Sequence, residues 1–259
     1  MSVENFHVVQ PQEPLVEVLP DLYLLRGSIK LAPGISINRN MVVIREGGEL
    51  TLIGAVRMTP DNEGRLEELG RVTNLVRIST HGVDDAYTKS RFGTRFWCFS
   101  GTEAAYERPA PDEVFDESHG LPFLSADLHR FRGINGSEVA LIWRKNDGVL
   151  ITSDALQHYG DWRFFNAPSR LIHPLMGFSR GMIVGPVWHR MLTEDESVLR
   201  RSFESLLDGD FKHMMGLHGT LCRDVAKDRI RAAIVREFDE GPAMPDLAFR
   251  LFRRMMNAG

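Results

Sequence analysis

The stretch LVRISTHGVDDA, residues 75–86, is the part of the sequence from which the fold can be argued. Residues 75–79 are rich in apolar and β-branched side chains, which favours a buried strand. His81, Asp84 and Asp85 follow this predicted strand directly. Side chains at a strand end can converge on a metal or a substrate. Equally, Asp84 and Asp85 could cap the next segment while His81 bonds the backbone.

The same arrangement recurs twice further along the chain. Asp154 follows a second apolar run, and His218 follows a third run that could form a terminal strand. Carboxylate oxygens together with imidazole nitrogens suit Zn²⁺, Mn²⁺ or Fe. Three strand ends that each deliver a histidine or an aspartate predict one site, in which the converging side chains are His81, Asp85, Asp154 and His218.

Two hairpins and three helices surround these strand ends. Glycine accepts the positive φ of tight turns, so Gly-Gly and Asp-Gly between apolar runs predict the hairpins. Threonines mark two helix starts: Thr59 stands before Pro60, and Thr193 forms a capping-box pattern with Glu196. The hairpins are predicted over residues 41–53 and 139–152, and the helices over residues 60–69, 199–207 and 225–238.

Length and composition limit the class of protein. The chain has 259 residues, of which 43% are hydrophobic and 25% charged, and its formal net charge is −4. This is an ordinary globular balance, and the negative charge argues against a nucleic-acid-binding surface. No repeat, low-complexity tract or linker divides the chain. We expect one domain over residues 1–259, with a surface arm at residues 1–14 and a C-terminal helix within residues 239–259.

Cysteine usage and hydropathy predict the compartment. Cys98 and Cys222 are too few for a disulfide framework and fit buried thiols in a reducing environment. The first residues lack the basic and apolar regions of a secretory signal, and no run approaches the roughly 18 apolar residues of a membrane helix. We therefore expect a cytoplasmic protein that binds a small molecule, and neither membrane nor nucleic acid. The oligomeric state stays open.

The order of these elements resembles the metallo-β-lactamase superfamily over most of the chain. The first metal motif of that family is HxHxDH after a strand, and its first histidine and its aspartate fall on His81 and Asp85. The family's bridging aspartate falls on Asp154, and its final histidine on His218. The resemblance implies an α+β fold, a four-layer αββα sandwich, and a metal-dependent hydrolase.

The family motif is incomplete in this sequence. Its second and last histidines fall on Val83 and Ala86, which cannot bind a metal. The family's next histidine is missing from residues 133–136, although His129 is close. The resemblance therefore implies at most one divalent metal (Zn, Mn or Fe), or none. The remaining ligands are Asp85, Asp154 and His218, with His81 as a fourth ligand, a partner of a ligand or a proton carrier.

The residues after the motif are aromatic and basic. The pattern HGxDD at residues 81–85, followed by such residues from Tyr87 to Trp97, resembles a divergent branch of the superfamily. Without a metal, neighbouring carboxylates repel each other. We therefore expect one of them to have a raised pKa, or to pair with a base such as Arg91 or Arg95.

Three functions remain open. The first is a metal-dependent hydrolase of unknown substrate, in which His81 or Asp85 handles the proton. The second is a non-catalytic protein of the same fold that has lost its metal site and binds a ligand. The third is a serine hydrolase, because residues 177–181 match GxSxG around Ser179. That motif needs a strand before it and a helix after it, which the sequence does not provide. We expect Ser179 not to be a nucleophile.

Overall fold

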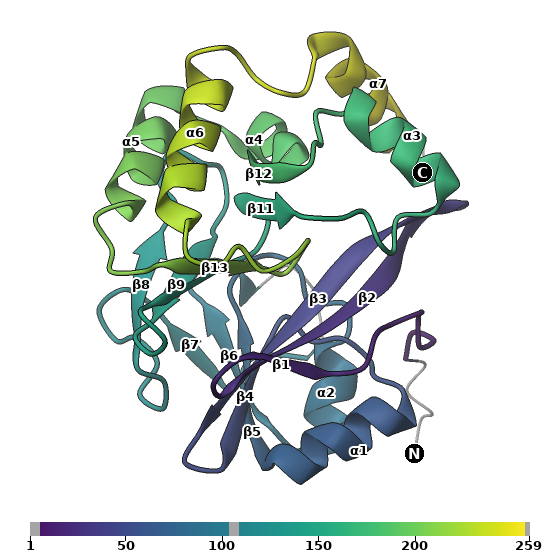
Figure 1. Cartoon of the computed structure of the whole chain (residues 1–259), viewed down its shortest axis with the longest axis vertical. Coiled ribbons are helices and arrows are strands. Elements are labelled where there is room, and N and C mark those ends of the chain that lie inside the picture. The colour runs from purple at the N-terminus through teal and green to yellow at the C-terminus, as the bar shows by residue number, and fades with distance from the viewer. Residues whose placement is uncertain (1–5, 104–108, 257–259) are drawn as a thin grey trace.

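The structure is a computed structural model that describes residues 6–103 and 109–256, and two β-sheets dominate it (Figure 1). The larger sheet has seven strands that lie side by side in sequence order. Strands β1 to β4 are antiparallel, and β4 to β7 are parallel. The strands are β1 (Val16–Leu19), β2 (Leu22–Ala32), β3 (Ile35–Glu46), β4 (Glu49–Ile53), β5 (Arg71–Arg77), β6 (Arg95–Phe99) and β7 (Glu113–Phe115).

The smaller sheet has four strands in the order β13-β10-β9-β8. Strand β10 pairs with β13 in parallel, while the β10–β9 and β9–β8 pairs are antiparallel. Strands β11 and β12 form a separate antiparallel pair. The bounds are β8 (Ala126–Arg130), β9 (Val139–Trp143), β10 (Val149–Thr152), β11 (Leu156–Tyr159), β12 (Gly181–Val184) and β13 (His213–Gly216). Both predicted hairpins are confirmed, as β3–β4 and β9–β10.

The helices are α1 (Pro60–Leu69), α2 (Asp85–Phe92), α3 (Ala167–Leu175), α4 (Pro186–Leu192), α5 (Glu196–Leu206), α6 (Ala226–Phe238) and α7 (Asp246–Met256). Thr59 caps α1 as predicted, because its side chain accepts a hydrogen bond from the Asn62 amide. The predicted capping box at Thr193 is wrong. Asp195 stands directly before α5, so its carboxylate reaches the first free amides, whereas Thr193 donates to His189 in α4. Among the described residues, no helix is long and apolar enough to cross a membrane.

Apolar side chains fill three layers around the two sheets. The layer between the sheets includes Val42, Ile44, Val76, Leu141, Trp143 and Ile151. The outer face of the larger sheet packs on α1 through Leu52, Leu66, Leu75 and Phe96. The outer face of the smaller sheet packs on α5 and α6 through Ile142, Leu150, Leu199, Phe203 and Ile230. Helices therefore cover the outer face of each sheet, and the predicted α+β four-layer αββα sandwich is confirmed.

The long hairpin of β2 and β3 crosses the molecule from the larger sheet toward α3 (Figure 1). At its tip, the Ser36 amide donates to Asn166 and Ser169 at the start of α3. Residues 11–13 run along β2, where the Ser28 amide donates to the Pro11 carbonyl. This hairpin brings the middle of β3 against the loop after β13, which carries one of the predicted site residues.

Candidate functional site

Three of the four predicted side chains meet at Asp154. Asp154 follows β10 and His218 follows β13; because these strands are parallel neighbours, their ends lie at the same sheet edge. His81 Nε2 lies 2.5 Å from Asp154 Oδ2, and His218 Nε2 lies 3.3 Å from Asp154 Oδ1. Each oxygen of one carboxylate therefore faces a different imidazole.

Strand β3 holds the loop that carries His218. Nδ1 of His218 donates to the Asn38 carbonyl at 2.8 Å. The side-chain Nδ2 of Asn40 donates to the carbonyls of Gly216 and Gly219 at 2.9 and 3.0 Å, and the Gly219 N–H donates to the Asn38 side chain. A carbonyl only accepts, so the Nδ1 nitrogen carries a proton and Nε2 faces the carboxylate. Two buried asparagines thus fix the position of this histidine, with Nδ1 toward a carbonyl and Nε2 toward the carboxylate.

His81 and Asp154 form an ion pair. The Asp154 charge raises the pKa of His81 to about 9. Burial by itself would raise the pKa of Asp154, but the His81 charge and hydrogen bonds from His218 and His81 hold that pKa below its usual range. The His81 side chain is 56% exposed and that of Asp154 is 16% exposed. At neutral pH, an imidazolium at the surface covers a carboxylate beneath it.

A second carboxyl group, Glu138, acts on this pair and was not predicted. Glu138 stands just before β9, is buried, and accepts a hydrogen bond from the Ala155 amide at 2.8 Å. Burial, reinforced by the Asp154 charge, raises the pKa of Glu138 well above its ordinary value. An acidic residue directly before a strand of apolar residues is a sequence signal that could have identified it.

Asp85 does not join the other three predicted residues. It is the first residue of α2 and is buried, and its Oδ2 lies 2.8 Å from Arg77 Nε and 2.7 Å from Arg77 Nη2. Burial raises the pKa of Asp85 against the opposing charge of Arg77. A Cβ at Gly82 would lie 2.2 Å from Asp85 Oδ2, so the backbone packs closely over the pair. The carboxylate predicted to bind a metal and handle a proton is half of a buried ion pair.

Two arginines that were not predicted balance the carboxylates of the motif. Arg77 neutralises Asp85, and Arg39 Nη1 from β3 lies 2.9 Å from Asp84 Oδ2. Asp85 has the raised pKa that was expected of one carboxylate, and it also pairs with a base. That base is Arg77, because Arg91 and Arg95 pair with glutamates of α1 and β7. The sequence could have indicated the role of Arg77, because a charged residue inside an apolar strand needs a buried partner of opposite charge.

The donor set around Asp154 does not fit a metal ion. Two ligands of one tetrahedral zinc, each about 2.1 Å from it, lie about 3.4 Å apart. His218 and Asp154 match this separation at 3.3 Å, whereas the 2.5 Å between His81 and Asp154 is a direct hydrogen-bonding contact. The Asp85 carboxylate is already engaged by Arg77. Across residues 6–103 and 109–256, no group of three or more His, Cys, Asp or Glu side chains is arranged to hold a metal.

The remaining candidates lie outside this cluster. His129 is part of β8, and its Nε2 contacts Ser202 Oγ at 3.5 Å. Ser179 is exposed and lies between α3 and β12. A helix therefore precedes the GxSxG motif and a strand follows it, which is the reverse of a nucleophile elbow.

Comparison with solved structures identifies the architecture. VMB-1 aligns with a TM-score of 0.63 at 11% identity, over 88% of this chain and 98% of that one. The DIM-1 metallo-β-lactamase aligns with a TM-score of 0.60 at 12% identity, over 87% and 100%. FIM-1 from Pseudomonas aeruginosa, a metallo-β-lactamase solved in its mono-zinc form, gives 0.57 at 7% identity, over 88% and 96%. No protein-family model and no curated protein matches the chain. At these identities the likeness establishes a shared fold and leaves the chemistry open.

Proposed function

We propose that this chain, which has the metallo-β-lactamase fold, binds a small-molecule ligand without using a metal centre. The observation that carries the proposal is the direct contact between His81 and Asp154. An imidazolium supplies the positive charge beside the carboxylate that the family uses as a bridging ligand. The protein itself therefore provides the charge balance that a metal would otherwise provide.

The other two carboxylates of the motif are also paired with positive side chains of the protein. Asp85 is paired with Arg77, and Asp84 is paired with Arg39. Metal ligands must be deprotonated, so an ion at this site would have to displace the proton of His81, whose pKa is raised to about 9. Competition from these protein cations supports a binding role over metal-dependent hydrolysis.

A second candidate, a hydrolase with a single metal, is favoured by one observation. Nδ1 of His218 donates to a backbone carbonyl, and this hydrogen bond orients Nε2 in the way that metal-binding histidines are commonly oriented. The 3.3 Å between His218 Nε2 and Asp154 Oδ1 also suits two ligands of one ion. This candidate requires His81 to leave Asp154.

Elemental analysis separates the two candidates. Three proteins are purified from medium supplemented with zinc, manganese and iron: wild type, Asp154→Ala and the control Asp127→Ala. The control removes an exposed carboxylate that is paired with Arg144. We expect less than about 0.1 metal ion per chain in all three proteins. About one ion per chain in wild type and Asp127→Ala, and none in Asp154→Ala, would replace our proposal with the single-metal hydrolase.

A further inference from the structure

A cavity of about 400 Å³ lies beside β11 and β12, close to the loop that follows His218. Its volume is within the range of small-molecule sites, about 300–1,000 Å³. In the described part of the chain no acidic residue lines it. Its lining includes three arginines and an apolar wall, among them Arg180, Arg223, Arg229, His158, Tyr159 and Leu221.

The arginines of this cavity are anchored by neutral groups. Arg180 donates to the Gly160 carbonyl, and Arg223 donates to the Val18 carbonyl. Within residues 6–103 and 109–256, neither these two arginines nor Arg229 forms an ion pair with a carboxylate. Three positive charges therefore surround one cavity in a chain whose formal net charge is −4.

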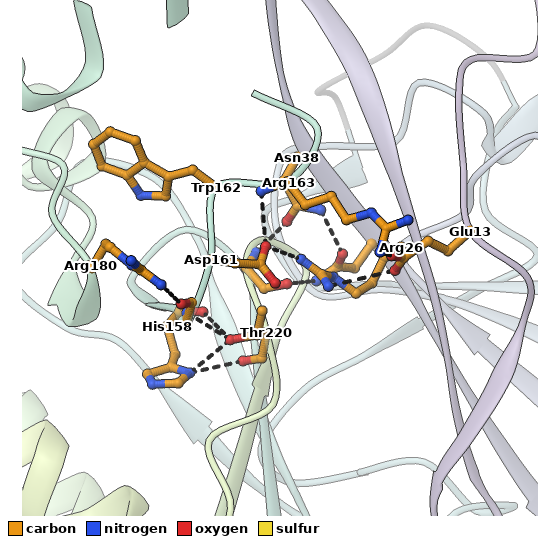
Figure 2. Close-up of polar contacts among 12 residues, drawn as sticks. Glu13, Arg26, Asn38, His158, Asp161, Trp162, Arg163, Arg180 and Thr220 are labelled. Atoms are coloured by element: carbon orange, nitrogen blue, oxygen red, sulfur yellow. Dashed lines mark hydrogen bonds and ion pairs between the residues drawn. The ribbon is translucent and has the colours of Figure 1, made fainter. Parts of the chain in front are cut away.

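Neighbouring arginines show the contrast (Figure 2). Arg26 Nη2 lies 2.6 Å from Asp161 Oδ1, and Arg163 Nη1 lies 2.5 Å from Glu13 Oε1. Arg180 lies in the same view, where its contact is to a backbone oxygen. Carboxylates of the protein thus balance the charges of Arg26 and Arg163, whereas no carboxylate among the described residues pairs with the arginines of the cavity.

Helix α6 adds to the positive potential of the cavity. Its N-cap residue, Val225, lines the cavity and makes no side-chain cap hydrogen bond; the first turn also contains Asp228, and its Ala226 N–H donates to the Lys212 carbonyl. The N-terminal end of a helix carries a partial positive charge and favours anions. Burial and, to a lesser extent, the Arg229 charge lower the pKa of His158. The effect on His158 is consistent with the Arg229 charge lying at the cavity.

We propose that this cavity binds a phosphorylated small molecule. One guanidinium satisfies both oxygens of a carboxylate, whereas three guanidiniums from separate segments match a group that accepts hydrogen bonds from several directions. Tyr159, Leu221 and Val225 supply an apolar wall for the organic part of the ligand. The inference rests on the proposed function, because it names the ligand class of the binding protein.

Calorimetric titration of the full chain with phenyl phosphate tests the proposal, with benzoate and inorganic phosphate as comparison probes. The variants are Arg229→Gln and Arg223→Gln. The matched control is Arg231→Gln, which removes an exposed α6 arginine that is paired with Asp228. We expect phenyl phosphate to bind more tightly than either comparison probe. Binding should weaken by about tenfold or more in each cavity variant, as is typical of a lost charged hydrogen bond, and by less than about twofold in the control.

Four results would overturn this proposal. The first is that binding does not saturate at about 10 mM phenyl phosphate, which corresponds to a negligible affinity. The second is that Arg231→Gln weakens binding as much as the cavity variants, and the third is that benzoate binds as tightly as phenyl phosphate. The fourth is that His81→Ala abolishes binding, which would place the ligand at the Asp154 cluster. Stoichiometric metal in wild type would overturn the proposed function instead. It would leave the dependence of phenyl phosphate binding on Arg229 unchanged.

Discussion

Asp85 and Asp154 both follow a strand and were predicted to share one metal, yet their surroundings differ. Asp85 is buried against Arg77, whose side chain is 1% exposed. Asp154 is reached by two histidines from other segments, one of them at the surface. The cation of the first pair belongs to the strand before the motif, and the cation of the second belongs to a loop. Equivalent positions at strand ends can therefore serve stability in one case and remain accessible in the other.

The largest effect should come from breaking the buried pair. Asp85→Ala leaves the Arg77 charge buried without its partner, and we expect a loss of about 3–5 kcal/mol in the free energy of unfolding, measured by urea denaturation. The control Asp127→Ala breaks an exposed pair and should lose less than about 1 kcal/mol. The double variant Arg77→Met/Asp85→Leu should recover most of the loss. Equal losses in Asp85→Ala and the control would contradict the stabilising role of the buried pair.

A smaller effect is expected at Asp154. Asp154→Asn removes the charge that His81 and His218 face but keeps an acceptor oxygen in place. We expect a loss of about 1–2 kcal/mol in the same denaturation experiment, because only hydrogen bonds to a charged group are weakened. The difference between the stability losses of Asp154→Asn and Asp85→Ala measures how much burial of the ion pair contributes to the free energy of unfolding. A loss larger than that of Asp85→Ala would reverse the order of the two pairs.

The pH dependence sharpens the same contrast. The pKa of His81 is raised to about 9 from 6.5, so the pair stabilises the fold fully below about pH 6.5 and loses this contribution as pH rises through about 9. The pKa of Asp154 is lowered, so its contribution is present above about pH 4 and is lost in stronger acid. NMR titration of the imidazole should give a His81 pKa near 9 in wild type, falling toward 6.5 in Asp154→Asn. An unchanged value in the variant would rule out the ion pair.

The smallest effect is expected at Ser179, which belongs to neither pair. Ser179→Ala should change the free energy of unfolding by less than about 0.5 kcal/mol, because the residue is exposed and has no special backbone role. A fluorophosphonate reagent should leave Ser179 unlabelled, as judged by peptide mass spectrometry. Stoichiometric labelling at this serine would restore the serine-hydrolase interpretation.

Local patterns made the layers and three residues of the site predictable. Turn glycines and alternating apolar runs mark the hairpins, because turns and strand burial depend on neighbouring residues. Asp154 and His218 could be grouped because they follow the parallel neighbours β10 and β13, and His81 reaches them from the end of β5 in the other sheet. The partner of Asp85 could not be predicted so directly, because its choice of Arg77 over Arg91 depends on side-chain packing behind the motif.

The contacts made by Asn38 and Asn40 lie beyond what local patterns predict, and they also bear on the order of folding. Their hydrogen bonds to Gly216 and Gly219 join positions 176 to 181 residues apart in the chain. Contacts between positions so far apart carry a larger loop-closure cost than local contacts and are typical of slower folding steps. We infer that His218 reaches its place near the end of folding. Local opening of this loop would release His218 from Asp154 while both sheets stay intact.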